Sequence, residues 1–391
     1  MDYTIAESGQ IEALCGEVGG LYERLKQLKD RRDPRGVRYP LAAVLMIMVL
    51  AKLSGEDEAR GIAEWAKWRA KLLAKALGLT RESMPHHTTY SRIMGHAVEV
   101  EQFEAVVREY FSRHQPAEAH MALDGKTMRG TIEPGHTQGV HLLAAYLPEV
   151  GVVVGQTAVA SKENEIVVAP ELLANLDLQG AVVSGDALLA QRTLSSQIVA
   201  AGGNYVWVVK DNQPQLLADI ERLFAPENCL PGHGPLRVDF ARASTLDKAH
   251  GRLERRTLTA SSLLQGYSQW PHLAQVFRLE RQTLTLRSGH LRQEVVYGVT
   301  SLSRAQASPD RLLHLVRRHW GIENEAHYSR DMTFKEDRCR LNTGCAAHVM
   351  AILNNLTLGL IRLLKFDFIP QARRFFNARL DLALDLLLAP P

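Results

Sequence analysis

Three acidic side chains lie in sequence contexts that favour chemistry. Asp124, in "HMALDGKTMRG", and Asp186, in "AVVSGDALL", each stand where an apolar, strand-like run is expected to stop and a turn to begin. Burying a carboxylate at the end of a strand is costly unless something pairs with it. If the two strands are neighbours in a sheet, both aspartates converge beyond the strand ends. Glu323 lies in "VRRHWGIENEAHY", which has helical periodicity.

Carboxylates brought together in this way favour a divalent cation. Their mutual repulsion raises their pKa values unless a cation neutralises them. Oxygen ligands of this kind suit Mg²⁺ or Mn²⁺, which keep water molecules and accept phosphate oxygens as further ligands. Two such ions about 3.5–4 Å apart can activate a water or a 3′-hydroxyl and stabilise the leaving oxygen. Asp124, Asp186 and Glu323 therefore predict a two-metal site for phosphoryl transfer.

The same acids are also compatible with structural roles. An Asp at a strand end is commonly a turn or helix cap, and Glu323 is also typical of an exposed helix charge. Counting by four from Glu323 gives His319 and His327, and counting by seven gives Arg330. These polar groups are predicted to share one helix face.

The elements that position the acids follow from changes of pattern along the chain. Residues 1–116 are predicted to form a helical, DNA-binding domain. Residues 117–227 alternate Val-rich strand patterns with helical patterns, which predicts the first part of an α/β fold with a mixed sheet covered by helices. Residues 228–300 are β-rich, and residues 301–391 return to helices that complete the core.

Two segments of the helical region are informative. "YPLAAVLMIMVLAKLSG" has roughly 14 residues before Lys52, fewer than the ~20 that span a membrane, which predicts a buried core helix. "PHHTTYSRIMGHAV" predicts a helix capped by Thr88 or Thr89 after Pro85. Several short helices of this kind suit a helix-turn-helix DNA reader, and they suit a plain helical bundle equally well.

The composition limits the class of protein without identifying it. The formal net charge of +3 permits nucleic-acid binding without proving it. Four cysteines are too few for a disulfide framework, which favours a reducing cytoplasm. Cys339, Cys345 and His348 lie close together in the sequence but fit no common zinc spacing. The acidic N-terminal segment lacks a secretory signal pattern.

Seven motifs, in a fixed order, connect the chain to a known family. They are "LDGKTMRG", "SKENEI", "GDALLAQ", "WVVKDNQPQL", "HGRLERR", "YGVTSL" and "RRHWGIENEAHYSRDMTFKEDRCR". Together they resemble bacterial insertion-sequence transposases with an Asp-Asp-Glu triad, in the branch that includes the H-repeat-associated proteins of Rhs elements. "DPRGVRYPLAAVL" resembles the N-terminal segment of that branch, and the match spans roughly residues 30–365.

The resemblance implies a ribonuclease-H-like catalytic core with a β-rich insertion between the second Asp and the Glu. By position it makes Asp124, Asp186 and Glu323 the catalytic residues and the ligands of two Mg²⁺ or Mn²⁺ ions per site. It implies a DNA transposase that cleaves element ends and joins their 3′-hydroxyls to target DNA. We expect a homodimer on double-stranded DNA, in the bacterial cytoplasm at the nucleoid, without a membrane.

Two features of the resemblance leave alternatives open. Asp331, Glu336 and Asp337, in "RDMTFKED", compete with Glu323 for the third ligand position. Ala326 and Tyr328 stand where the family usually has Leu and Trp, so full activity of this copy is an open question. Three other functions are also compatible with the sequence: an endonuclease that cuts without joining, a non-catalytic DNA-binding relative, and an unrelated enzyme on a similar sheet.

Polar residues in the shared motifs are predicted to contact DNA phosphates, because Lys, Arg, His and Asn side chains position a DNA backbone without reading its sequence. In related transposases an Arg often stands four residues before the Glu, and in this chain that residue is His319. The predicted contacts are Lys126, Lys162, Asn164, Lys210, Asn212, His250, Arg252, Arg318, His319 and His327. For each of them an ordinary surface role is an equal alternative.

Overall fold

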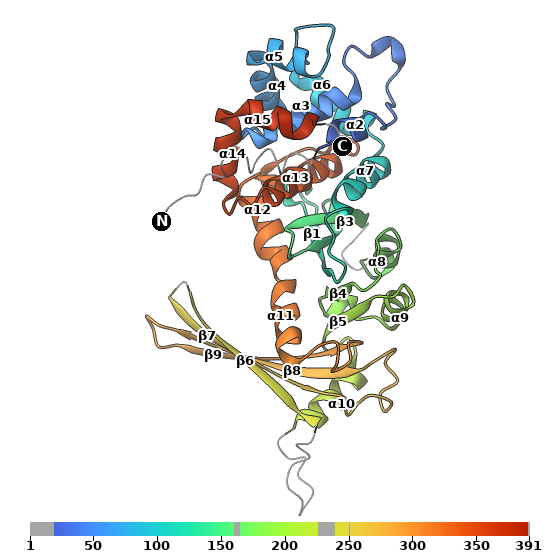
Figure 1. Ribbon diagram of the computed structural model, residues 1–391, viewed down its shortest axis with the longest axis vertical. Coiled ribbons are helices and arrows are strands. Elements are labelled where there is room, and N and C mark those ends of the chain that lie inside the picture. The colour runs from blue at the N-terminus through green and yellow to red at the C-terminus, as the bar shows by residue number, and fades with distance from the viewer. Residues whose placement is uncertain (1–18, 160–164, 226–238, 250, 390–391) are drawn as a thin grey trace, which may run out of the picture. The chain divides into compact units, whose positions relative to one another are not determined.

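The computed structural model describes residues 19–159, 165–225, 239–249 and 251–389 (Figure 1). It is a mixed α/β structure with a helical N-terminal region, as predicted. The nine strands of the described residues form a sheet in the order β3-β2-β1-β4-β5-β9-β8-β7-β6. The contacts group the chain into two compact units. The first unit contains Met1–Gln115, Gly125–Lys162 and Glu323–Pro391, and the second contains Pro116–Asp124 and Glu163–Ile322.

The first unit is mainly helical. Its helices are α2 (Leu21–Leu25), α3 (Leu41–Leu53), α4 (Ala59–Trp68), α5 (Ala70–Ala76), α6 (His87–Arg92), α7 (Val100–Ser112), α12 (Tyr328–Met332), α13 (Ala346–Leu363), α14 (Ile369–Ala378) and α15 (Leu380–Leu388). Its strands β2 (His141–Leu147) and β3 (Val152–Val159) pair antiparallel. It also contains the last residues of β1 (His120–Thr127), whose first residues belong to the second unit.

Helix α3 lies in the core of the first unit. All of its 13 residues are buried, because α2 and α4 contact it from one part of the chain and α13, α14 and α15 from the other. This burial confirms the core helix predicted from the apolar run. Helix α13 is also long and apolar enough to cross a membrane, but 83% of its apolar window is buried inside the structure. Among the described residues it is therefore a second core helix.

Helix α6 has a different cap from the predicted one. The helix begins at His87, and the imidazole of His86 accepts the N–H of Thr88. Thr88 and Thr89 are already inside the first turn, whereas a capping residue must precede the helix with extended backbone. His86 has that backbone, with φ −71° and ψ 155°. The prediction of Thr88 or Thr89 as the cap was therefore wrong.

The second unit contains the rest of the sheet. Its strands are β4 (Val182–Gly185), β5 (Asn204–Val209), β6 (Ala241–Ala249), β7 (Arg252–Ser261), β8 (Gln275–Thr285) and β9 (Leu291–Thr300). Its helices are α8 (Glu165–Ala174), α9 (Arg192–Ala200), α10 (Pro214–Phe224) and α11 (Pro309–His319). β4 pairs parallel with both β1 and β5, whereas β9 pairs antiparallel with β5.

Strands β6 to β9 form an antiparallel meander that is crossed by α11 (Figure 1). Helix α11 contacts β6 and β7. Leu312, Leu313 and Val316 of the helix share a core with Leu258 and Phe277 of the strands. Burying these side chains removes apolar surface from water, which stabilises the position of α11 on the sheet. The helix ends at His319, so this packing also positions the segment that leads to Glu323.

Candidate active site

Asp124 and Asp186 occupy adjacent positions on neighbouring parallel strands. Leu123 of β1 and Gly185 of β4 are register partners, and each aspartate is the next residue. Paired strands are about 4.8 Å apart, so the register brings the two acids close together. Their charges also act jointly on one neighbouring side chain, that of His319. The sequence analysis predicted this convergence on the condition that the two strands are neighbours. The strand order shows that β1 and β4 are neighbours.

Strand β1 does not stop at Asp124, as the sequence predicted, but continues to Thr127. The cause is the unequal length of its neighbours in the sheet. β4 ends at Gly185, whereas the pairing with the β2 side continues as far as Met128, whose N–H donates to the carbonyl of Val140 at 2.9 Å. Asp124 is therefore a half-buried residue inside a strand, at the level where the strand beside it ends.

Asp186 is both a cap and a candidate ligand. It precedes the 3₁₀ turn Ala187–Leu189, and its Oδ1 accepts the backbone N–H groups of Leu188 at 2.9 Å and Leu189 at 3.4 Å. The side chain is exposed. Because both hydrogen bonds go to one oxygen, the carboxylate is fixed in orientation while its charge faces solvent.

Two side chains after β5 brace the turn that carries Asp186. Asn212 donates to the carbonyl of Ala187, and Gln213 donates to the carbonyl of Ala190 at 3.0 Å. The amide of Asn212, which was predicted to contact DNA, is therefore engaged within the protein. Gly185 is also constrained, because a Cβ there would lie 2.8 Å from the Trp207 ring.

Three buried polar side chains form a hydrogen-bonded chain in the second unit. His120 Nε2 lies 2.7 Å from Ser184 Oγ, and the same oxygen lies 3.0 Å from His319 Nδ1. Burial lowers the pKa of His120 to about 3. Burial also lowers the pKa of His319, although Asp124 and Asp186 oppose the shift. Both imidazoles are therefore neutral near pH 7.

Glu323 lies in a π-helical turn, not in the continuous α-helix that the sequence predicted. The turn Ile322–His327 separates α11 from α12. A π turn changes the helical register, because its hydrogen bonds span five residues instead of four. The two residues have separate partners: His319 bonds to Ser184, and Arg330 pairs with Glu336. The boundary between the two units falls immediately before Glu323.

No three His, Cys, Asp or Glu side chains within the described part of the chain gather closely enough to hold a metal ion. Asp124 and Asp186 belong to the second unit and Glu323 to the first. The three-ligand, two-metal site stays a prediction on this structure.

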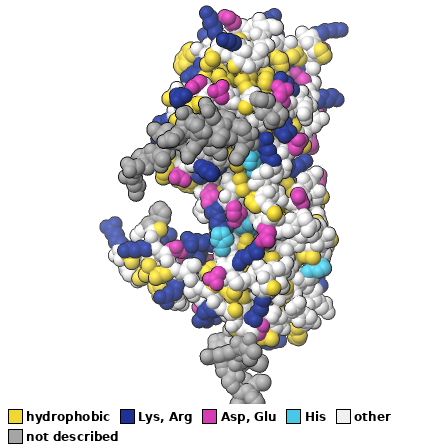
Figure 2. Space-filling model, in the orientation of Figure 1, with side chains coloured by type: hydrophobic (Ala, Val, Ile, Leu, Met, Phe, Trp, Pro, Cys, Tyr) yellow, Lys and Arg dark blue, Asp and Glu magenta, His cyan; other side chains and the backbone are white. Residues whose placement is uncertain are grey.

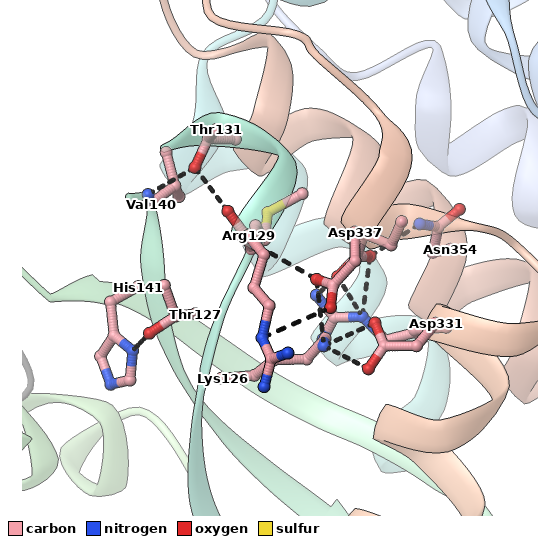
Figure 3. A network of polar contacts seen from close by, with 12 residues as sticks. Lys126, Thr127, Arg129, Thr131, Val140, His141, Asp331, Asp337 and Asn354 are labelled. Carbon is pink, nitrogen blue, oxygen red and sulfur yellow. Dashed lines mark hydrogen bonds and ion pairs between the residues drawn. The ribbon is translucent and has the colours of Figure 1, made fainter. Parts of the chain in front are cut away.

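The rival acids are held by cations of the first unit (Figure 3). Lys126 Nζ contacts both oxygens of Asp331, at 2.6 and 2.7 Å. Asp337 accepts the backbone N–H of Arg129 at 3.1 Å and lies 3.7 Å from Lys126 Nζ. Lys126 is only 8% exposed, so its ammonium serves this network and not the surface.

Glu336 is the most buried of the rival acids, with 1% of its surface exposed. Arg330 donates to both of its oxygens, at 2.6 to 3.0 Å, and Asn354 donates at 2.7 Å. Burial by itself would raise the pKa of Glu336, but Arg330 and Asn354 outweigh it and hold that pKa below its ordinary value. Glu336 is therefore an ionised structural acid.

The other predicted DNA contacts differ in exposure. Lys162, Asn164 and His250 lie outside the described residues. Lys210, after β5, and Arg252, at the start of β7, are exposed. The remaining predicted contacts are less accessible: Arg318 is half-buried, and His319 and His327 are buried.

Arg252 lines an arginine-rich hollow of about 310 Å³ on the β6–β9 meander. The hollow is lined by Arg252, Glu254, Arg256, Arg281, Thr283, Thr285, His290, Arg292 and Glu294. Glu254 pairs with Arg256 at 2.7 Å, and Glu294 pairs with Arg281. The arginines outnumber the glutamates, and Figure 2 shows Lys and Arg side chains gathered on this part of the surface.

The sequence analysis missed Ser184, His120 and the bracing role of Asn212. A signal for the first two was present, because alternate residues of a strand share a face. Ser184 stands two positions before Asp186, and His120 four positions before Asp124. Polar residues at even spacing from a candidate acid, within otherwise apolar runs, point to the same side of the sheet as that acid.

Comparison with known proteins identifies the family. Residues 115–360 match the family model described as "Transposase DDE domain", and residues 22–111 match "DDE_Tnp_1-associated". "Putative transposase YncI" of Escherichia coli O157:H7 is 28% identical over 357 residues, which cover 88% of each chain. "H repeat-associated putative transposase YhhI" of Escherichia coli K12 is 25% identical over 353 residues, which cover 88% of this chain and 91% of that protein.

The chain is also similar to a solved structure titled "Cryo-EM structure of piggyBac transposase synaptic complex with hairpin DNA (SNHP)". The alignment covers 96% of this chain and 80% of the chain in that structure. Its identity of 10% and TM-score of 0.45 are too low to support an argument. The sequence matches confirm the predicted resemblance to insertion-sequence transposases, including the H-repeat-associated proteins. Because the family model covers more than half of the chain, the protein belongs to the family of transposases with a DDE domain.

Proposed function

We propose that this protein is a DNA transposase that cleaves the ends of an insertion element and joins the freed 3′-hydroxyls to target DNA. The observation that carries the proposal is the adjacent placement of Asp124 and Asp186 where β4 ends beside β1. Ligands of open α/β sheets bind beyond the carboxyl ends of the strands. The transposase family to which the chain belongs supports the same reaction.

The two aspartates fit a divalent cation by their chemistry. Carboxylate oxygens are the ligands that Mg²⁺ and Mn²⁺ prefer. Both backbone hydrogen bonds to Asp186 go to Oδ1, and Oδ2 accepts none from the described residues. A pair of bound ions would polarise the phosphate and lower the pKa of a bound water. In this proposal the protein supplies Asp124 and Asp186 as ligands and holds Asp186 in place through Asn212 and Gln213.

We propose Glu323 as the third ligand. Asp331 and Glu336 are paired with Lys126 and Arg330, and Asp337 lies 3.7 Å from Lys126 Nζ, which supports structural roles for these three acids. Glu323 lies in a π-helical turn, and such turns occur frequently at functional sites.

The strand order supports a ribonuclease-H-like core. β1, β4 and β5 are parallel neighbours, β2 and β3 form an antiparallel pair beside them, and the β6–β9 meander lies between Asp186 and Glu323 in the sequence. The exposed Lys210 and Arg252 supply contacts to DNA phosphates in this proposal. The protein would act as a homodimer that pairs two element ends, in the cytoplasm at the nucleoid.

A cleavage and joining assay tests the proposal. The element ends are found first, as short inverted repeats around the coding region that are bounded by direct duplications. The full chain is then incubated with Mg²⁺ and a labelled end, either intact or already cut. We expect nicking of the intact end and joining of the cut end. Asp124→Asn and Asp186→Asn should each lower the rate by about 10²–10³-fold or more, because each removes a negative charge that acts on the reacting phosphate through the bound ions.

Asp177→Asn is a matched control. Asp177 is an exposed aspartate, and like Asp186 it accepts the backbone N–H of the residue two positions later: Oδ1 of Asp177 lies 3.0 Å from the nitrogen of Gln179. This variant should cleave at the rate of the wild type. Nicking without joining of a pre-cut end would instead identify an endonuclease. DNA binding with no metal-dependent cleavage by the wild type would contradict a catalytic role.

A further inference from the structure

The His120–Ser184–His319 chain lies in the second unit, and the charges of Asp124 and Asp186 act on its last member, His319. Its three members come from β1, β4 and the end of α11. They are 3%, 2% and 9% exposed, respectively. Polar groups buried to this extent are costly unless they are hydrogen-bonded, and Ser184 Oγ supplies one partner to each of the two imidazoles.

The chemistry of the chain sets the direction of its hydrogen bonds. A serine hydroxyl has one proton to donate and lone pairs to accept with. Nδ1 of His319 faces Ser184, so Nε2 lies at the opposite side of the ring. If Nδ1 carried the ring proton, Nε2 would present a lone pair to the field of two carboxylates, which is electrostatically unfavourable. The favourable arrangement has His120 donating to Ser184, Ser184 donating to His319 Nδ1, and the proton of His319 on Nε2.

We propose that Ser184 and His120 hold His319 in its Nε2–H tautomer, so that His319 donates a hydrogen bond to the Asp124–Asp186 pair and acts as a positioning residue for these metal-binding carboxylates. The proposal rests on the proposed function, since it assumes that the two aspartates bind a divalent cation. Partners of this kind around ligating side chains typically change metal affinity by about 10- to 100-fold when removed.

Direct binding of Mn²⁺ tests the proposal without DNA. Free Mn²⁺ is measured by electron paramagnetic resonance while it is titrated into the full chain. We expect Ser184→Ala to weaken Mn²⁺ binding by about 10- to 100-fold. Ser184→Thr keeps the hydroxyl and should restore binding to within a few-fold of the wild type, even if the added methyl group lowers the melting temperature.

Thr127→Ala is the matched control. Thr127 Oγ1 lies 2.8 Å from Nδ1 of His141, another buried strand histidine, in the first unit. Removing this hydroxyl should leave Mn²⁺ affinity unchanged. Wild-type affinity in Ser184→Ala, or equal losses in Ser184→Ala and Thr127→Ala, would overturn the proposal.

The tautomer of His319 gives a second measurement, which does not depend on the Ser184 variants. Long-range ¹⁵N–¹H spectra of histidine-labelled wild-type protein should show the proton of His319 on Nε2, with the His319→Gln spectrum used to assign the signal. A proton on Nδ1 would overturn the proposal. If the wild type binds Mn²⁺ and cleaves DNA but Ser184→Ala is unchanged, only this inference fails. If the wild type neither binds Mn²⁺ nor cleaves DNA, the proposed function fails as well.

Discussion

Two groups of acidic residues, one in each unit, have different surroundings. In the first unit, Lys126 holds Asp331 and Arg330 holds the fully buried Glu336. In the second unit, backbone N–H groups cap Asp186, and the buried imidazole of His319 lies in the field of both Asp124 and Asp186.

The difference indicates which acids are structural. A carboxylate whose charge is balanced by a built-in cation stabilises the fold, but it has little capacity left for an external metal. A carboxylate that is capped by backbone N–H groups, as Asp186 is, keeps its full negative charge, which is what a metal-binding site requires. Asp331 and Glu336 therefore serve the stability of the fold, whereas Asp124 and Asp186 are carboxylates that we propose as metal ligands.

The largest effect on stability is expected at Glu336. Glu336→Gln removes the charge that balances Arg330 inside the core, so the free energy of unfolding should fall by about 3–5 kcal/mol. Urea denaturation measures this change. Asp331→Asn, at a pair that is partly exposed, should cost about 1 kcal/mol or less. A Glu336→Gln protein with wild-type stability and no cleavage activity would reverse the comparison and make Glu336 a ligand.

A large effect on activity is expected at Glu323. Glu323→Gln should lower the rate of DNA nicking by about 10²–10³-fold, because it removes a charge that acts on the transition state through the metal. Its free energy of unfolding should change by only about 0.5 kcal/mol, as for most substitutions outside the core. Asp337→Asn serves as the comparison and should keep most of its activity. Loss of nicking in Asp337→Asn at unchanged stability would identify Asp337, and not Glu323, as the third ligand.

A smaller effect is expected at Gly185, which supports the Asp186 turn. In Gly185→Ala the new Cβ would meet the Trp207 ring and Leu189 at 2.8 to 3.1 Å. Overpacking of this kind should lower the free energy of unfolding by about 1–3 kcal/mol, and it should also reduce nicking because Asp186 is displaced. Gly36→Ala is the control, since a Cβ there meets nothing within 4 Å. Equal stability of the two variants would show that the turn is not tightly packed.

The last effect concerns the pH dependence of stability, and it is small near neutral pH. Burial lowers the pKa of His120 from 6.5 to about 3, so between these values the unfolded chain binds a proton that the folded chain excludes. The contribution of His120 to stability is therefore complete above pH 6.5 and decreases as the pH falls toward 3. One such group contributes up to about 1.4 kcal/mol per pH unit. His120→Gln should flatten this part of the pH dependence measured by urea denaturation, and an unchanged slope would contradict the buried, neutral state.

The convergence of the two aspartates was predictable because it depends on local signals. Apolar runs followed by Asp124 and Asp186 mark strands, and parallel strands align their carboxyl ends. The continuation of β1 past Asp124 was not predictable, because it depends on β2, a neighbour whose length has no trace in the local pattern.

The surroundings of Glu323 show a second limit of sequence reasoning. Helical periodicity assumes a constant 3.6 residues per turn, and the π turn Ile322–His327 breaks that assumption. No residue type in this segment predicts the π turn. His319 and Arg330, which the count placed on one face, consequently have partners in different units.

Long-range partners were the least predictable part of the candidate site. Lys126 and Asp331 are 205 positions apart, and Ser184 and His319 are 135 apart. Each residue taken alone has the properties of an ordinary surface or core residue. Only the folded chain shows that Lys126 neutralises a rival acid and that Ser184 holds an imidazole beside the aspartates.

The burial of α3 depends on helices that are synthesised much later than α3 itself. Helices α14 and α15 cover part of α3, and Arg373 donates to the carbonyl of Lys52, 321 positions earlier. An almost wholly apolar helix therefore leaves the ribosome long before its covering residues have been synthesised. Until then the nascent chain exposes a surface that chaperones bind and that aggregates readily. We expect translation products that stop before α14 to be degraded instead of persisting as partial enzymes.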